Sequence, residues 1–240
     1  MTPDLFLLAA IVMCGVTVQT TAGFGAMLVC VTLGALRWPI AELIPLIVPA
    51  LLVQSVWTVM RNHHQVQWGF LLRRVLPIML LGMVAAMLLT GRDVSAFRPL
   101  LGGLILALGL RELFRRVAGP PPPPWQSTLG IFGAGIIHGL FATGGPLLVW
   151  SIGRESFTKN QLRTTLNAIW MLLNTVMIGI FVFRHQVTTD TLTRSAWMLP
   201  AVGLGLMWGE RLHHRVDERY FRKLVWVILC MAAIPLLIPR

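Results

Sequence analysis

Two short stretches of the sequence combine glycines with polar side chains inside long apolar segments. The first is TTAGFGAML at residues 20–28, and the second is FATGGPLL at residues 141–148. Glycine and proline are unfavourable in the interior of a helix, so each stretch predicts a break in a helix. At membrane depth, irregular backbone survives only where protein or a water-filled cavity surrounds it. The two breaks are therefore candidates for a binding site.

Each break is expected to start a new short helix whose unpaired amide groups point at the break. Because proline is favoured at the first position of a helix, we expect one helix to begin near Pro146 and its counterpart near Ala26. The N-terminus of a helix carries free N–H groups and a partial positive charge. Two such ends that face each other predict an anion site without any cationic side chain.

Polar residues near the breaks supply the candidate ligands. His138 is the only histidine deep in an apolar segment, where it is either a hydrogen-bonded structural residue or a substrate ligand or proton carrier. Asn167 and Asn174 share a helix face with Arg163 by their spacing, and they either hold helices together or line the substrate path. The predicted substrate-binding residues are Gln19, Thr20, Thr21, Gly23, Gly25, His138, Thr143, Gly144, Gly145, Asn167 and Asn174.

The composition places these breaks in a membrane protein. Hydrophobic residues make up 56% of the 240 residues and charged residues 12%, whereas soluble domains carry about 25% charged residues. The net charge of +11 comes from short basic clusters between apolar runs, which argues against a nucleic-acid partner. Membrane-spanning runs are predicted at 43–60, 75–90, 97–114, 165–183, 195–209 and 221–238.

The two halves of the chain look like copies of each other. The glycine spacing of 15–28 matches that of 135–148. Residues 1–116 and 127–240 are therefore predicted to form two transmembrane repeats, joined by a stiff proline-rich linker at 117–126. Each repeat then holds one glycine-broken segment and three transmembrane helices, which together make an all-α polytopic membrane protein.

The distribution of basic residues favours one of two topologies. If both broken segments cross the membrane, the repeats are parallel and the basic residues divide almost evenly between the two faces. If both segments dip in and return, the repeats are inverted and all but six of the 20 Lys and Arg residues share one face. We prefer the inverted topology, with the basic face in the cytoplasm. The six residues on the other face are then Arg37, Arg92, Arg98, Arg184, Arg194 and Arg240.

With these features identified, the chain resembles the TauE/SafE family of membrane proteins, the sulfite exporters. The resemblance covers nearly the whole chain and rests on TAGFGAML, on FATGGPLL, and on NQLRTTLNAIWMLLN at 160–174. It implies a transporter that exports sulfite, a sulfonate or a related organic anion across the bacterial cytoplasmic membrane. Ala26 and Met27 stand where more glycines are common in the family.

Two other functions are open to the sequence. One is a membrane scaffold or assembly factor without transport, in which the polar residues at the breaks are dispensable. The other is an intramembrane hydrolase that uses Ser151 and His138, although no G-x-S-x-G context surrounds the serine. We expect no catalytic residue, metal or cofactor, and the only partners predicted are a small anion and lipid. The oligomeric state is open, with a homodimer as one option.

Overall fold

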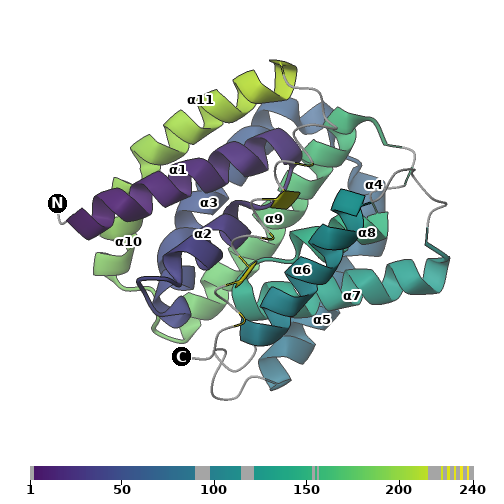
Figure 1. The fold of residues 1–240 in the computed structure, drawn as a ribbon, viewed down its shortest axis with the longest axis horizontal. Coiled ribbons are helices and arrows are strands. Elements are labelled where there is room, and N and C mark those ends of the chain that lie inside the picture. Colours follow the sequence, from purple (N-terminus) through teal and green to yellow (C-terminus); the bar gives the residue numbers. More distant parts are fainter. Residues whose placement is uncertain are drawn as a thin grey trace.

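The structure is a computed structural model. It describes residues 3–89, 98–114, 122–152, 155 and 157–215, together with single positions between 223 and 237. Within these parts of the chain all regular structure is helical and there is no strand (Figure 1). Half of the linker predicted at 117–126, and most of the helix predicted at 221–238, lie outside the described residues.

The predicted all-helical membrane architecture is confirmed at this level. Among the described residues, the stretches long and apolar enough to cross a membrane are Asp4–Ala22, Ile40–Gln65, Trp68–Leu88 and Lys159–Phe183. The helices are α1 (Pro3–Ala22), α2 (Ala26–Gly34), α3 (Ile40–Asn62), η1 (His63–Gln65), α4 (Trp68–Phe70), η2 (Leu71–Val75), α5 (Leu76–Leu89), α6 (Arg98–Phe114), α7 (Pro124–Phe141), α8 (Gly145–Ile152), α9 (Lys159–Phe183), α10 (Thr189–Trp197) and α11 (Leu199–Arg215).

The first broken segment folds into a hairpin made of α1 and α2. The chain turns at Gly23 and Gly25, whose φ angles of 88° and 108° lie in the left-handed region that glycine adopts without strain. α2 begins at Ala26, where the sequence predicted a new helix. A Cβ atom at Gly15 would lie 2.8 Å from the carbonyl oxygen of Ala26, so this glycine lets the two helices approach closely.

The second broken segment repeats this plan in α7 and α8. Its left-handed residue is Ala142, with a φ of 52°, and α8 begins at Gly145, directly before the proline at which the sequence predicted a helix start. A Cβ atom at Gly144 would collide with the carbonyl oxygen of Ala134 in α7. In this break an alanine makes the turn, and the glycine is needed for close packing.

Both hairpins return to the end of the molecule from which they started. Arg37, after α2, forms an ion pair of 3.0 Å with Asp4 at the start of α1. In the second hairpin, Ser127 near the start of α7 donates a hydrogen bond of 3.0 Å to the carbonyl oxygen of Ser151 near the end of α8. Each broken segment therefore goes in and comes back rather than running straight through the molecule.

The hairpins are held by helices from the other half of the chain. α1 packs along α11, α7 packs along α5, and α3 packs against α9 at the centre of the molecule (Figure 1). Close approach to α1 depends on Gly205 and Gly209, because added Cβ atoms there would lie 2.8 Å from the Met13 oxygen and 2.5 Å from Thr20 Cβ. These glycines therefore serve close packing of the two helices.

Two predicted spans need correction. The run predicted at 195–209 is divided, because α10 ends at Trp197 and α11 begins at Leu199. Pro200 in the first turn of α11 has no N–H group to continue the hydrogen-bond ladder, which explains the interruption. The run predicted at 75–90 starts earlier, since helical structure already begins at Trp68.

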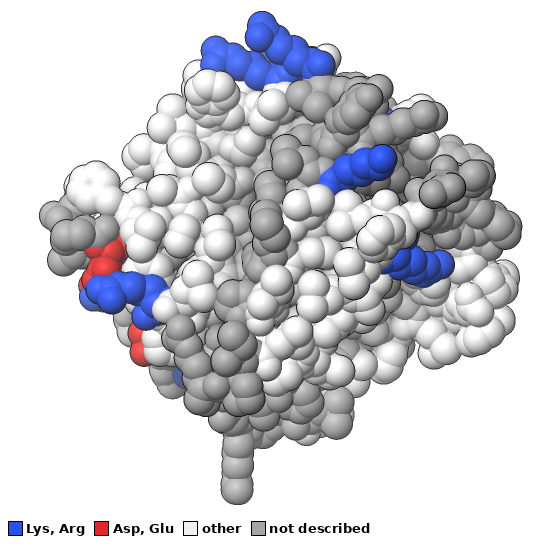
Figure 2. All heavy atoms as spheres, in the orientation of Figure 1, with Lys and Arg blue, Asp and Glu red and all other residues white. Residues whose placement is uncertain are grey.

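The helix directions define two ends of the molecule. The basic end, where α3, α6 and α11 finish and α9 begins, carries Arg61, Arg74, Arg111, Lys159 and Arg215. The N-terminal end, where α1 begins and α9 finishes, carries Asp4, Arg37, Arg184 and Arg194. Figure 2 shows basic side chains at the top, over the end of α11, and acidic side chains at the left, near the N-terminus.

Candidate functional site

The two helix breaks meet around one small, buried cavity, called here the central cavity. Its volume is about 20 Å³, which is room for about one water molecule. Gly145 of the second break packs against Phe24 of the first, since a Cβ added to the glycine would lie 2.8 Å from the phenylalanine ring. The cavity is lined by Gln19, Gly25, Met27, Leu51, His138, Ala142, Thr143, Gly144, Gly145, Trp170 and Asn174.

The lining includes most, but not all, of the residues predicted to bind the substrate. Seven of them line the cavity, namely Gln19, Gly25, His138, Thr143, Gly144, Gly145 and Asn174. Thr21 instead donates a hydrogen bond of 3.1 Å to the Gly209 carbonyl, which ties α1 to α11. Gly23 accepts a hydrogen bond of 2.8 Å from the Trp170 indole. Thr20 and Asn167 lie outside the lining, toward the basic end.

A chain of buried amide side chains fixes the wall of the cavity nearest the basic end. Gln19 Nε2 donates to Gln54 Oε1 at 2.6 Å, and Gln54 Nε2 donates to Asn167 Oδ1 at 3.0 Å. The Gln19 side-chain oxygen accepts from the amide of Ala26 at 3.3 Å, so it satisfies the first N–H group of α2. Because α1, α3 and α9 each contribute one amide, the network sets how these three helices lie around the site.

His138 and Asn174 present buried polar atoms that have no protein partner. His138 is 1% exposed, and neither ring nitrogen makes a hydrogen bond. Asn174 Oδ1 is likewise buried and unpaired. Leaving such a group unsatisfied costs about 1–3 kcal/mol, so native proteins keep few of them without a ligand, water or functional reason. Both residues line the central cavity, which places their free polar atoms around one small space.

Trp170 is one of the lining residues that the sequence did not single out. Its indole stacks on the His138 ring, with centroids 5.6 Å apart and planes 20° apart. It therefore holds the imidazole flat against the wall of the cavity. A signal was present, since Trp170 follows Asn167 by three positions and precedes Asn174 by four, which puts all three on one helix face.

The N-termini of α2 and α8 supply the remaining polar groups of the site. The first amides of a helix have no partner within that helix, and the helix dipole makes them attractive to negative charge. Ala26 already donates its amide to Gln19, which leaves those of Met27 and Leu28 in the first turn of α2. In α8, Pro146 lacks an N–H group, so Gly145 and Leu147 provide the amides.

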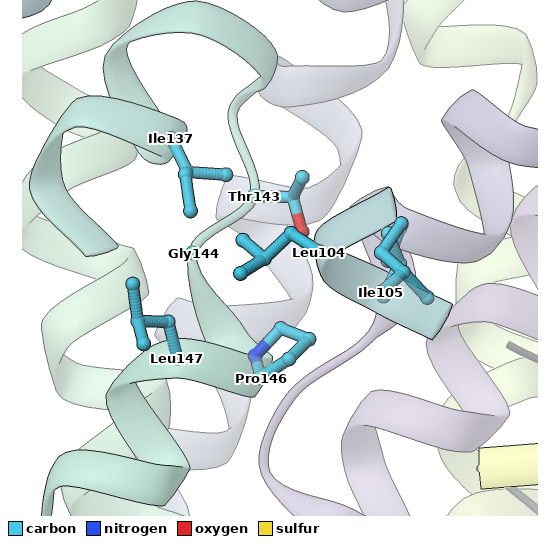
Figure 3. Close-up of a pocket in the computed structure, with 8 residues that line it drawn as sticks. Leu104, Ile105, Ile137, Thr143, Gly144, Pro146 and Leu147 are labelled. Atoms are coloured by element: carbon cyan, nitrogen blue, oxygen red, sulfur yellow. The ribbon is translucent and has the colours of Figure 1, made fainter. Parts of the chain in front are cut away.

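Apolar packing seals the outer side of the second break. Leu104 and Ile105 of α6 lie opposite Thr143, Gly144 and Pro146, around a gap of about 10 Å³ (Figure 3). The inner side of the same break faces the polar central cavity. The irregular backbone is thus covered by protein on one side and borders the cavity on the other, as the bilayer requires.

The geometry does not support a hydrolase. Ser151 Oγ donates a hydrogen bond of 2.7 Å to the Leu147 carbonyl in its own helix, and His138 makes no hydrogen bond to it. A serine nucleophile needs a base within hydrogen-bond reach. Among the described residues, no group of three or more His, Cys, Asp or Glu side chains is placed to hold a metal ion.

Two helix hairpins from different parts of the chain, with their breaks at one buried polar cavity, define a membrane transporter built on discontinuous helices. The chain belongs to the sulfite exporter TauE/SafE family, because the sequence model of that family matches residues 7–236. The members of this family are transporters and not enzymes, which agrees with the missing serine–histidine contact.

Two curated relatives show how far the similarity extends. A probable sulfite/organosulfonate exporter, TauE, from Cupriavidus necator is 22% identical over 243 residues, covering 97% of this chain and 93% of that protein. A probable inner membrane transporter protein, TsaS, from Comamonas testosteroni is 24% identical over 178 residues, covering 73% of this chain and 74% of that protein. No solved structure matches the chain.

Proposed function

We propose that this chain exports a small sulfur oxyanion, such as sulfite or a sulfonate, across the inner membrane through the central cavity. The observation that carries the proposal is the meeting of two helix N-termini with the unpaired ring nitrogens of His138 in one buried space. The names of the two relatives, a sulfite/organosulfonate exporter and an inner membrane transporter, support the substrate class and the location.

The donors around the cavity suit an oxyanion. A neutral imidazole donates from one ring nitrogen, and the first turns of α2 and α8 add backbone donors. No Asp, Glu, Lys or Arg is among the residues that line the cavity. The anion is then held by dipoles and neutral groups, which bind it without the deep electrostatic well of a buried cation and allow it to leave.

The size of the cavity implies that binding requires movement. About 20 Å³ holds about one water molecule and not a sulfonate. We expect the two hairpins to move apart to admit the anion, because their breaks form two walls of the cavity. Export of a monoanion is favoured by about 2.3 kcal/mol for each 100 mV of inside-negative potential, so this transport requires no coupling ion.

We further propose that residues 1–116 and 127–240 are inverted repeats, joined by the segment at 117–126. The supporting observation is the exchange of packing partners between the halves. α1 of the first half runs parallel to α11 of the second, while α7 of the second half runs parallel to α5 of the first. One hairpin starts at the N-terminal end and the other at the basic end, as a two-fold axis in the membrane plane would require.

Efflux from proteoliposomes tests the transport function directly. The purified full-length protein is reconstituted, and loss of internal sulfite, methanesulfonate or acetate is followed with and without an imposed membrane potential. We expect efflux of the sulfur anions to be fastest when the potential is negative on the loaded side. Efflux equal to that of protein-free liposomes for every anion would leave the scaffold function as the better account.

A further inference from the structure

A buried ion pair lies between the central cavity and the basic end. Arg163 stands in the first turns of α9 with a side chain that is 5% exposed, and its Nη1 group donates to Glu210 Oε1 of α11 at 3.2 Å. The same Nη1 group donates to the carbonyl oxygen of Thr20 at 2.8 Å, in the last turn of α1 before its break. Nε of Arg163 is buried without a hydrogen-bond partner. The guanidinium therefore has donor capacity left for another acceptor.

A second side chain holds the same end of α1. One ring nitrogen of His213 lies 3.0 Å from the Thr21 carbonyl oxygen, and the other lies 2.8 Å from Asn160 Oδ1 at the start of α9. The last carbonyl groups of a helix have no partner within the helix, and they attract positive charge. Arg163 and His213 thus fix the position of the first break from the basic end.

The path on the other side of the central cavity is hollow. A second cavity, of about 100 Å³, lies between the central cavity and the N-terminal end. α9 lines both spaces, with Asn174 in the central cavity, Met177 and Phe181 in the second one, and Arg184 at its outer end. On this face of α9, the side chains nearer the N-terminal end border open space. Toward the basic end, the buried side chains of Asn167 and Arg163 fill the corresponding space.

We propose that the Arg163–Glu210 ion pair is the gate between the basic end and the central cavity, and that a small oxyanion opens it by replacing Glu210 on the guanidinium. The proposal rests on the proposed transport function. The pair is closed here, and Thr20 links it to the break of α1. Arg163 contacts the anion in this scheme, and through the Thr20 carbonyl it also holds the helix that carries Gln19.

The exchange of acceptors follows from the chemistry of the pair. Removing one partner of a buried ion pair leaves an uncompensated charge, so Arg163 releases Glu210 only when another anion takes its place. Glu210 is 26% exposed and is able to withdraw toward water. A guanidinium binds two oxygens of a sulfonate or sulfite side by side, and the free Nε–H is part of one such fork. Positive charge at the basic end raises the local concentration of anions.

A cysteine reporter in the central cavity tests the gate. Leu51→Cys lines the cavity, and it is introduced after Cys14, Cys30 and Cys230 are replaced by alanine. A membrane-impermeant anionic thiosulfonate reagent is then applied to vesicles of either orientation. Glu210→Gln is expected to raise the labelling rate from the basic end about tenfold and to leave the rate from the N-terminal end unchanged. Glu210→Asp, which keeps the charge on a shorter side chain, is expected to give an intermediate rate.

The control variant breaks another arginine–carboxylate ion pair, which is exposed and lies away from the path. Asp190→Asn removes the carboxylate from the exposed Arg194–Asp190 pair, whose atoms are 2.8 Å apart at the N-terminal end. It is expected to change labelling from neither side. A purely structural role for Glu210 predicts equal increases from both sides, because a loosened fold admits the reagent everywhere, and this result would overturn the gate.

Transport kinetics supply the second measurement. With Glu210 replaced by glutamine, methanesulfonate no longer competes with a carboxylate for Arg163, so its KM from the basic end is expected to fall severalfold. A reduced kcat with unchanged KM would contradict the exchange. Protection of Leu51→Cys by methanesulfonate separates the two proposals. If methanesulfonate protects Leu51→Cys from labelling, but Glu210→Gln labels from the basic end no faster than its parent, the gate alone is rejected. If methanesulfonate gives no protection in the protein with Glu210 intact, the binding site itself is rejected.

Discussion

Single residues at this site act through polar atoms that the protein leaves unpaired. His138 is buried, stacked on Trp170 and without a hydrogen-bond partner. By contrast, Gln19 uses both ends of its amide within the protein, on Gln54 and on the amide of Ala26. We infer that Gln19 shapes the site, while His138 and Asn174 are left to contact the substrate.

Replacing His138 tests this division of roles. His138→Ala removes a donor to the anion, and a hydrogen bond to a charged group is worth about 1.5–3 kcal/mol, so the transport rate at low sulfite is expected to fall at least about tenfold. His138→Gln, which keeps a side-chain donor, is expected to retain part of the activity. The measurement is initial efflux from proteoliposomes.

The control for the histidine substitution is a polar residue beside the site that faces outward. Thr175 follows Asn174 on α9, is exposed, and bonds only to the Met171 carbonyl of its own helix at 2.7 Å. Thr175→Ala is expected to transport at the parent rate. Full activity in His138→Ala, at equal protein in the liposomes, would remove the histidine from the binding site.

At the scale of elements, the hairpins depend on close helix contacts that only glycine permits. Gly209 on α11 faces the last turns of α1, where an added Cβ atom would lie 2.5 Å from Thr20 Cβ. Gly203, on the same helix, has no heavy atom within 4 Å of an added Cβ. Both glycines are helical, but one is closely packed and the other lies in open space. Comparing substitutions at the two positions therefore separates the effect of packing from that of helix propensity.

Alanine substitutions at these two positions are expected to have opposite effects on stability. Gly209→Ala forces α1 and α11 apart, and overpacking of this kind destabilises by about 1–3 kcal/mol. Gly203→Ala adds a better helix former in open space, and it is expected to be neutral or to stabilise by up to about 1 kcal/mol. Thermal unfolding of the purified protein in detergent measures both. A higher midpoint for Gly209→Ala than for Gly203→Ala would contradict the packing at this crossing.

At the scale of the whole molecule, the two hairpins start at opposite ends and meet in the middle. A parallel and an inverted arrangement of the repeats differ in where matching positions lie. The tripeptide HQV occurs at 64–66 and again at 185–187, once after α3 and once after α9. α3 and α9 run in opposite directions through the centre, so these two matching turns lie at opposite ends of the molecule.

Cysteine labelling in whole cells tests this topology. In the background without native cysteines, Gln186→Cys is expected to react with an impermeant maleimide from outside, and Gln65→Cys only after the membrane is opened. The basic end then faces the cytoplasm, as the positive-inside rule requires. Reaction of both positions from the same side would show that the repeats are parallel.

Much of the local structure follows from the sequence. Glycine and proline act on the backbone of their own neighbourhood, which is why helix starts near Ala26 and Pro146 were predictable and lie at Ala26 and Gly145. The division of the run at 195–209 was signalled by Pro200 but missed. Of the predicted residues at the breaks, Gly25, Thr143, Gly144 and Gly145 line the central cavity, whereas Thr20, Thr21 and Gly23 do not.

The sequence by itself determined that this is a helical membrane protein, that two of its segments are broken, and which short helices begin at the breaks. Only the tertiary structure decided that Trp170 stacks on His138 and that Gln54 joins Gln19 to Asn167. It also decided that the side chains of Thr20 and Thr21 face α11 rather than the cavity, and that Arg163 binds the Thr20 carbonyl. These contacts depend on how each helix is rotated against partners far along the chain, and helix periodicity fixes which residues share a face but not what that face meets.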